Sequence, residues 1–216
     1  MNSSDTLGAQ IRDLLTTQGI ETPYAKDIGT PNIASIAGWF EQIMGELNLD
    51  VSNDDSLRDT PNRVAKMYCQ EIFYGLDYDN FPKITTVENK FSYDEMLVTK
   101  CQVRSLCEHH FVPFMGSAHI SYIPRTKVLG LSKFNRIVDF FSRRPQIQER
   151  LTAQIHSTLC HILETEDVAI VIKATHYCVH LRGVQDSTSG TVTSKLSGKF
   201  RTVPEARQEF LALTRA

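Results

Sequence analysis

The sequence predicts an α+β protein, in which helices pack on a largely antiparallel sheet and a helical region precedes it. Through the first third of the chain, apolar residues recur at helical spacing. From Glu95 onward, β-branched and apolar runs alternate with turn residues, and helical patterns are grouped between and around those runs. We therefore divide the chain into an N-terminal helical region, residues 1–94, and a sheet-containing domain, residues 95–216.

Three helices are expected in the first region. The first spans residues 5–19 and ends at Gly19, and residues 23–31 follow as a linker. Asn32 is the expected N-cap of the second helix, whose apolar stripe we interpret as core packing. Thr60 and Pro61 form an N-cap and first helical residue of a third helix, which runs toward Gly75.

Four strands are expected in the second region, over residues 96–105, 111–123, 167–178 and 190–200. One helix between them carries an apolar face from Phe134 to Phe141. Another follows Pro145, and a last one follows Pro204.

Composition narrows the classes of partner. The chain has 216 residues and a formal net charge of −2, so no global field favours nucleic acid or an anionic membrane. Five cysteines are an odd number, and no apolar segment follows a basic N-terminus, so neither export nor a disulfide framework is indicated. We expect a soluble cytoplasmic protein with reduced thiols.

The pattern Cys107-x-x-His110, together with His176-Tyr177-Cys178, indicates a catalytic zinc site. Such a site uses three Cys or His ligands and leaves the fourth position open, and Cys178 is the candidate third ligand. The alternative is that these cysteines simply fill core volume. His109 remains as a spare imidazole, and it reaches the same pocket as His110 only if the chain bends there.

A basic pair near a predicted helix start indicates an anion site. Ser132 is the expected N-cap, which places Lys133 and Arg136 near the first turn, where cations oppose the helix dipole unless an anion binds. Phosphate is the anion we expect, and two solvated surface cations are the alternative. Arg182 can approach this region, whereas Arg63 does so only through folding or a neighbouring subunit.

Gln148 and Glu149 lie near the start of the next helix. The helix dipole alone explains an early acid. The functional alternative is that the carboxylate accepts two hydrogen bonds from the adjacent N–H donors of guanine.

Four motifs carry a family resemblance: Cys107-Glu108-His109-His110-Phe111, Val128-Leu129-Gly130-Leu131-Ser132-Lys133, Arg143 to Leu151, and His176-Tyr177-Cys178. In this order they resemble GTP cyclohydrolase I, from about Ile33 to the C-terminus. The resemblance implies the tunnelling fold, a homodecamer and active sites between subunits. It also implies conversion of GTP and water to formate and 7,8-dihydroneopterin triphosphate, the entry to tetrahydrofolate.

The resemblance also implies roles for single residues. Zn²⁺ would be held by Cys107, His110 and Cys178, with His109, His176 and Ser132 as catalytic residues. Glu149 and Gln148 would bind guanine, and four basic residues would contact the ribose and triphosphate: Lys133, Arg136, Arg182 and, across a subunit interface, Arg63. His180 departs from the lysine of many relatives. The role of Lys195 is left open, and Cys69, Cys101 and Cys160 are interpreted as packing residues.

Two alternatives remain. One is another tunnelling-fold enzyme that acts on pterins or deazapurines, and the other is a non-catalytic zinc module. The latter predicts that removing the metal unfolds the protein.

Overall fold

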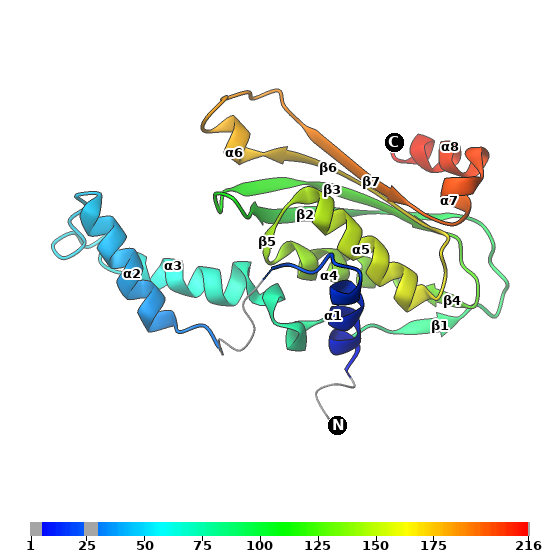
Figure 1. Ribbon diagram of the computed structural model, residues 1–216, viewed down its shortest axis with the longest axis horizontal. Helices are drawn as coiled ribbons and strands as arrows, with labels where there is room; N and C mark the ends of the chain where they lie inside the picture. The colour runs from blue at the N-terminus through cyan, green and yellow to red at the C-terminus, as the bar shows by residue number, and fades with distance from the viewer. Residues whose placement is uncertain (1–5, 24–29, 216) are drawn as a thin grey trace.

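The fold combines a mostly antiparallel sheet with helices on both of its faces (Figure 1). A computed structural model describes residues 6–23 and 30–215. The strands are β1 Thr86–Glu88, β2 Leu97–Cys107, β3 Pro113–Tyr122, β4 Lys127–Leu129, β5 Pro145–Gln146, β6 Val168–His176 and β7 Thr191–Leu196. The helices are α1 Leu7–Thr17, α2 Ile33–Glu46, α3 Thr60–Lys66, α4 Leu131–Ser142, α5 Gln148–Leu163, α6 Tyr177–His180, α7 Lys199–Thr202 and α8 Pro204–Leu213.

The main sheet has the order β5-β2-β3-β6-β7, and all its pairs are antiparallel except β2 with β5. The four predicted long strands and the helices α4, α5 and α8 are confirmed. Two predicted strands are shorter than expected. β6 ends at His176, so that Cys178 lies in the short helix α6, and β7 ends at Leu196 before α7.

Alternation along β6 assigns the helices to the two faces of the sheet. Ile170 and Ile172 point into the main core under α4 and α5, whereas Ala169 and Val171 point into a smaller core with Phe200 of α7. This is the period of two that a strand covered on both faces requires. The predicted α+β class with a largely antiparallel sheet is confirmed.

Helix α1 belongs to the main core. Ile11 and Leu15 are fully buried there, and α1 lies beside α5 (Figure 1). Thr6 caps the helix through Ala9 N–H, and Gly19 takes the left-handed conformation with φ +68° after its end. The predicted first helix is therefore confirmed, and most of the predicted linker lies outside the described residues. The domain division at residue 94 remains a prediction.

The core-packing interpretation of α2 is confirmed only in part. Asn32 caps the helix as predicted, accepting a hydrogen bond from Ser35 N–H. Of the predicted stripe, Ala37 and Met44 are buried, whereas Ile43 is 52% exposed and Leu47, just after the helix, is 66% exposed. The helix packs against α3 at a distance from the sheet, so the chain itself covers a narrow part of the apolar stripe (Figure 1).

The start of α3 also differs from the prediction. Its N-cap is Asp59, and Thr60 is already helical, with Pro61 behind it in the first turn. The predicted N-cap is therefore one residue too late, a difference within the one or two residues by which helix ends are usually uncertain. After Lys66 the helix widens into a π-helix, Met67–Ile72. Two tighter 3₁₀ turns follow, Tyr74–Leu76 and Tyr78–Asn80. Across the described residues, every helix is too short or too polar to cross a bilayer.

Candidate metal centre and active site

The last residues of β2 and β6, and the short helix α6 that follows β6, lie together at one end of the sheet. The register pairs Leu106 with Pro113 and Phe114 with His176, so the last residues of β2 and β6 lie at the same end of β3. This places Cys107, at the end of β2, opposite Cys178 in α6. The topology therefore brings together two motifs that are about 70 residues apart in the sequence.

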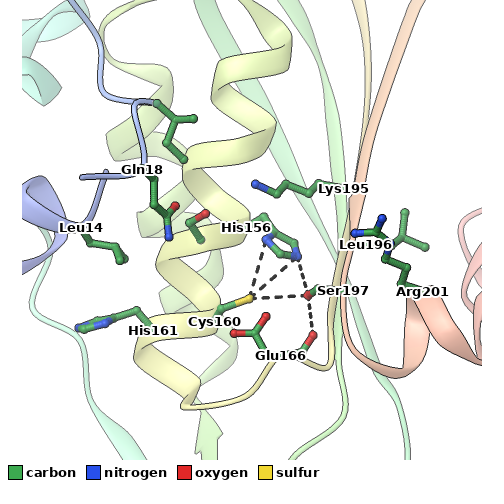
Figure 2. A pocket seen from close by; sticks show the side chains of 12 residues that line it. Leu14, Gln18, His156, Cys160, His161, Glu166, Lys195, Leu196, Ser197 and Arg201 are labelled. Carbon is green, nitrogen blue, oxygen red and sulfur yellow. Dashed lines mark hydrogen bonds between the residues drawn. The ribbon is translucent and has the colours of Figure 1, made fainter. Parts of the chain in front are cut away.

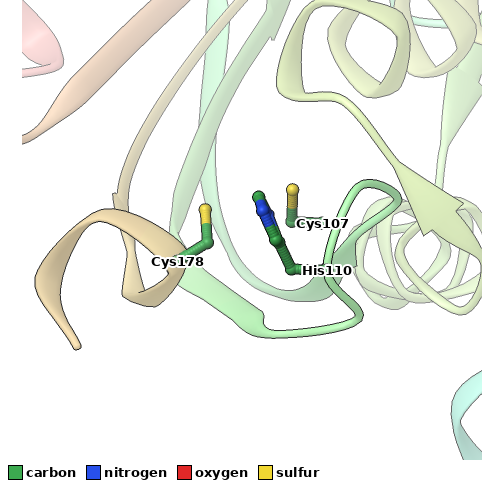
Figure 3. A group of neighbouring side chains, drawn as sticks. All are labelled: Cys107, His110 and Cys178. Carbon is green, nitrogen blue, oxygen red and sulfur yellow. The ribbon is translucent and has the colours of Figure 1, made fainter. Parts of the chain in front are cut away.

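Cys107, His110 and Cys178 form a group whose ligand atoms all lie within 4.8 Å of one another (Figure 3). In a tetrahedral zinc shell, neighbouring S and N ligands are roughly 3.5–3.8 Å apart, so a contraction of at most about 1.3 Å would complete the coordination. Two thiols and one imidazole suit zinc, and the three ligands leave a fourth position for water. The residue types and their arrangement fit a catalytic metal site.

A tight turn supplies His110 and also presents His109. Phe111 N–H donates to the Cys107 carbonyl over 2.8 Å, and Phe111 has the left-handed φ of 52°. The bend brings His109 Nδ1 to 3.4 Å from Cys107 Sγ, while His110 reaches the metal group. The two adjacent histidines thus lie beside the same group of side chains, which an extended strand would not allow.

Glu108 holds this turn against the rest of the fold. Its N–H donates to the Gln146 carbonyl over 3.0 Å, and its carboxylate pairs with Arg150 at the start of α5. Glu108 and Arg150 were not among the predicted site residues. The sequence shows only that two of the motifs carry opposite charges. It does not show that these two side chains, 42 positions apart, are in contact.

His176 has a defined position and protonation state. Its ring stacks on Phe114 at a centroid distance of 4.7 Å, and Nε2 lies 2.8 Å from Gln148 Oε1. An amide oxygen accepts hydrogen bonds, so Nε2 carries the proton and Nδ1 has the lone pair. Burial lowers the pKa of His176, and Glu149 opposes that shift. The side chain is therefore neutral at neutral pH.

Gln148 lies inside the protein beneath this histidine. Its buried amide nitrogen donates to the Ile172 carbonyl over 3.0 Å and to Thr193 Oγ1 over 3.1 Å. Glu149, the next residue, is exposed in the first turn of α5. The two residues predicted to act together therefore face different surroundings.

Electrostatics at the two thiols favour a cation. Burial raises the pKa of Cys178, and the neighbouring Cys107 sulfur raises it further. A bound metal ion reverses this effect, because it stabilises the thiolates directly. At the edge of the group, Arg182 Nη1 donates to His110 Nε2 over 2.8 Å, so the structure does bring Arg182 to the centre.

The other predicted phosphate residues lie away from the metal group. Helix α4 begins at Leu131 after the N-cap Gly130, so the prediction of Ser132 as N-cap is wrong. Glycine is accepted at that position, and its extended backbone, φ −62° and ψ 136°, starts the helix two residues earlier. Ser132 and Lys133 therefore lie in the first turn, which no side chain caps.

This turn lies at the far end of the sheet from the metal group. Leu129 N–H donates to the hydroxyl of Tyr122, which pairs with Leu97 at the start of β2. Leu106 is nine residue steps along the strand from Leu97, a length of about 30 Å. One chain therefore does not bring Ser132, Lys133 or Arg136 to its own Cys107. Arg63 pairs with Asp59 on α3 at 3.5 Å and, among the described residues, does not join the metal group either.

A second group of sulfur and nitrogen side chains lines a cavity of about 590 Å³ between α1, α5 and the end of β7 (Figure 2). His156 Nε2 lies 2.9 Å from Ser197 Oγ, and His156 Nδ1 lies 3.8 Å from Cys160 Sγ. Burial lowers the pKa of His156 to about 4 and raises that of Cys160 to about 11. Both side chains are neutral at pH 7, and Lys195 also lines this cavity.

Comparisons with known proteins give the same family for most of the chain. The family model described as GTP cyclohydrolase I matches residues 36–215. A GTP cyclohydrolase 1 of Aeromonas hydrophila is 55% identical over 94% of both chains, and one of Salmonella arizonae is 50% identical over 100% of this chain and 99% of its own. One of Shewanella sp. (strain ANA-3) is 52% identical, again over 94% of both chains.

Among solved structures, the apo form of an archaeosine synthase QueF-Like is similar with a TM-score of 0.41 and 18% identity, over 48% of this chain and 93% of its own. The family match and the curated relatives decide the family assignment, because they cover nearly all of this chain, including the three residues of the metal group. This chain belongs to the GTP cyclohydrolase I family.

Proposed function

We propose that the protein hydrolyses GTP to formate and 7,8-dihydroneopterin triphosphate, the first step of tetrahydrofolate biosynthesis. The observation that carries the proposal is the Cys107, His110 and Cys178 group, with two further histidines beside it, in a chain of this family. All five cysteines are free, which suits the reducing cytoplasm.

Cys107, His110 and Cys178 would hold a zinc ion. When bound, zinc lowers the pKa of a coordinated water from 15.7 toward about 7, which supplies a nucleophile for C8 of guanine at neutral pH. A neutral imidazole has one lone pair, so His110 cannot bind the metal through Nε2 and accept from Arg182 at once. Loading that nitrogen would release Arg182 for a phosphate group of the substrate.

His176 would move protons during opening of the imidazole ring. Because Gln148 keeps the proton on Nε2, Nδ1 is the atom that takes up a proton from the adding water. The same proton can then pass to the guanine nitrogen that leaves C8, so His176 ends the step neutral. His109, next to Cys107, would assist the later ribose opening and rearrangement.

Glu149 would bind the guanine, since its exposed carboxylate can accept from the N1 and amino donors together. Gln148 would contribute by orienting His176, because its amide is engaged inside the protein. His180, which stands where many relatives have lysine, donates from Nε2 to the Ser189 carbonyl over 3.2 Å, so one phosphate contact of those relatives would be weakened or lost here.

A second subunit would complete the site. The free N–H groups at the start of α4, with Ser132, Lys133 and Arg136, would bind the ribose and triphosphate of GTP held at the metal group of a neighbouring chain. The distance between these two places within one chain supports this arrangement. So do the exposed apolar side chains of α2 and the open edge of β7, which fit a tunnelling-fold homodecamer. In it, Arg63 would act across a subunit interface.

The test is to incubate the zinc-loaded protein with GTP and to follow formate release and pterin absorbance together. We expect both signals, and we expect a chelator to remove both. Formate without pterin would indicate ring opening without rearrangement and would point to His109, His176 or Ser132. Neither signal, from an assembled and metal-loaded protein, would refute the proposed reaction in favour of another tunnelling-fold enzyme or a binding module.

A further inference from the structure

A continuous path of buried hydrogen bonds joins the segment after α1 to the metal-binding turn. Gln154, in the middle of α5, makes the contacts to the segment after α1. The amide nitrogen of Gln154 donates to the Ile20 carbonyl over 2.8 Å and to Thr22 Oγ1 over 3.3 Å. Its amide oxygen accepts from Gln146 Nε2 over 2.7 Å. One side chain thus connects the N-terminal segment with β5.

Gln146 continues the path to the turn. Its side-chain oxygen accepts from Arg150 Nε over 3.1 Å, and Arg150 pairs with the carboxylate of Glu108. Its main-chain carbonyl accepts from Glu108 N–H over 3.0 Å, and in the sheet register Gln146 is the direct partner of Cys107. The path therefore ends on Glu108, one of the two residues between the ligands of the Cys107–His110 turn.

Both amides have a single allowed orientation. Gln146 and Gln154 are fully buried, and Gln146 Nε2 also donates to the Phe141 carbonyl over 2.9 Å. Turning either amide over would place oxygen against oxygen or nitrogen against a donor, and would leave buried groups unpaired. The hydrogen bonds accordingly run in one direction, from Arg150 through Gln146 and Gln154 to Ile20.

A buried ion pair fixes the same N-terminal segment at a second point. Arg144, which is fully buried, donates to Glu21 Oε1 over 3.0 Å and to the Tyr78 hydroxyl over 3.2 Å. Its guanidinium also lies 4.8 Å from the ring centroid of Phe140. Because Arg144 directly precedes β5, the segment Ile20–Thr22 is tied both to the strand and to the residue before it.

We propose that Gln154 and Gln146 are positioning residues, which transmit the seating of Ile20–Thr22 to Glu108 and thereby hold the Cys107–His110 turn in its metal-binding geometry. The segment after α1 then has a function in the metal centre, although it lies outside the motifs and contributes no ligand. Outer contacts of this kind orient metal ligands and raise metal affinity. The inference rests on the proposed metal centre.

The test compares Gln154→Met with Ile155→Val. Methionine has a similar volume but no amide, whereas Ile155→Val removes one methyl group from the same helix and core without touching the path. Zn²⁺ affinity is measured by competition with a chromophoric chelator, on protein shown by circular dichroism to be folded. We expect the dissociation constant to rise about 3- to 10-fold for Gln154→Met, below the 10- to 100-fold typical of residues that contact a ligand directly, and to stay unchanged for Ile155→Val.

The absorption spectrum of the Co²⁺-loaded protein provides a readout that general destabilisation does not move. We expect its bands to shift in Gln154→Met and to match the wild type in Ile155→Val. Equal affinity and an unchanged spectrum in Gln154→Met would overturn the proposal. Failure of the wild type to bind Zn²⁺ or Co²⁺ would instead refute the metal centre itself.

A double-mutant cycle tests whether the effect travels along this path. Combining Gln154→Met with Glu108→Gln should raise the Zn²⁺ dissociation constant by less than the product of the two single effects, because both changes break one connection. A full product would mean independent action and would overturn the proposal. Should Gln154→Met not fold, Arg150→Lys keeps the cation beside Glu108 but loses the Nε donor to Gln146, and carries the same expectation.

Discussion

The protein holds two groups of neighbouring cysteine and histidine side chains, one at each end of β6, and their surroundings give them opposite chemical characters. At the His176 end, Cys107, Cys178 and His110 face one another beside a tight turn, and burial together with the Cys107 sulfur raises the pKa of Cys178. At the Val168 end, His156 is buried and Cys160 is half-buried on one helix, with hydrogen bonds to Ser197 and the Val168 carbonyl. Proximity of sulfur and nitrogen is common to both groups, and convergence from separate segments is found in the first.

The largest expected difference between the groups is in catalysis. Cys107→Ser or Cys178→Ser should lower the rate of formate release by on the order of 10³-fold or more, because the metal supplies several kcal/mol of transition-state stabilisation. Cys160→Ser is the matched control, since it alters the other thiol group, and it should retain nearly full activity. A steady-state assay of the three variants checks this. Normal turnover by either ligand variant would exclude the three-ligand assignment.

Chelation separates a catalytic metal from a structural one. The metal group lies at one end of the main sheet. The core between this sheet and its helices is filled by apolar residues of β2, β3, β6, α4 and α5. Removing the metal should therefore abolish activity while the far-ultraviolet circular dichroism stays within a few per cent of the loaded protein. Unfolding on chelation would support the zinc-module alternative, because structural zinc contributes folding energy directly.

The guanine contact is expected to have an intermediate effect. Glu149→Gln leaves one acceptor but removes the charge that faces two donors, so GTP affinity should fall by roughly 1.5–3 kcal/mol. Equilibrium binding of GTP to the zinc-free protein measures this without turnover. Glu166→Gln, at the cavity of the second group, is the control for loss of one surface charge. Unchanged affinity in Glu149→Gln would remove that residue from the guanine site.

Much of the fold was predictable, and so was the metal group. Strand alternation and helical periodicity are local properties, so they placed β2, β3, β6, α4 and α5 to within a few residues. The spacing Cys107-x-x-His110 and the distant Cys178 were enough to predict a three-residue site, because few other chemistries need that set.

The sequence did not disclose what surrounds these elements. An apolar stripe such as that of α2 has the same pattern whether it packs inside its own chain or against another surface. The short strands β1, β4 and β5 have too few residues for a periodic signal. Gly130 rather than Ser132 caps α4, since the backbone there turns earlier than side-chain preference indicates. The contacts of Glu108 and Gln146 depend on register between distant segments.

The smallest expected effect concerns pH and the second group. Burial, with a smaller contribution from Lys195, lowers the pKa of His156 to about 4, below its ordinary value of 6.5. Between these two values the unfolded chain binds more protons than the folded one, so this residue's contribution to stability is complete above pH 6.5 and is lost as the pH falls toward 4.

From pH 7.5 to pH 5 the loss should be about 2 kcal/mol. His156→Gln keeps a donor for Ser197 but cannot titrate, so urea unfolding should show a weaker pH dependence by that amount. Parallel curves for the two proteins would mean that His156 is not held neutral, and the contrast between the two groups would then rest on geometry alone.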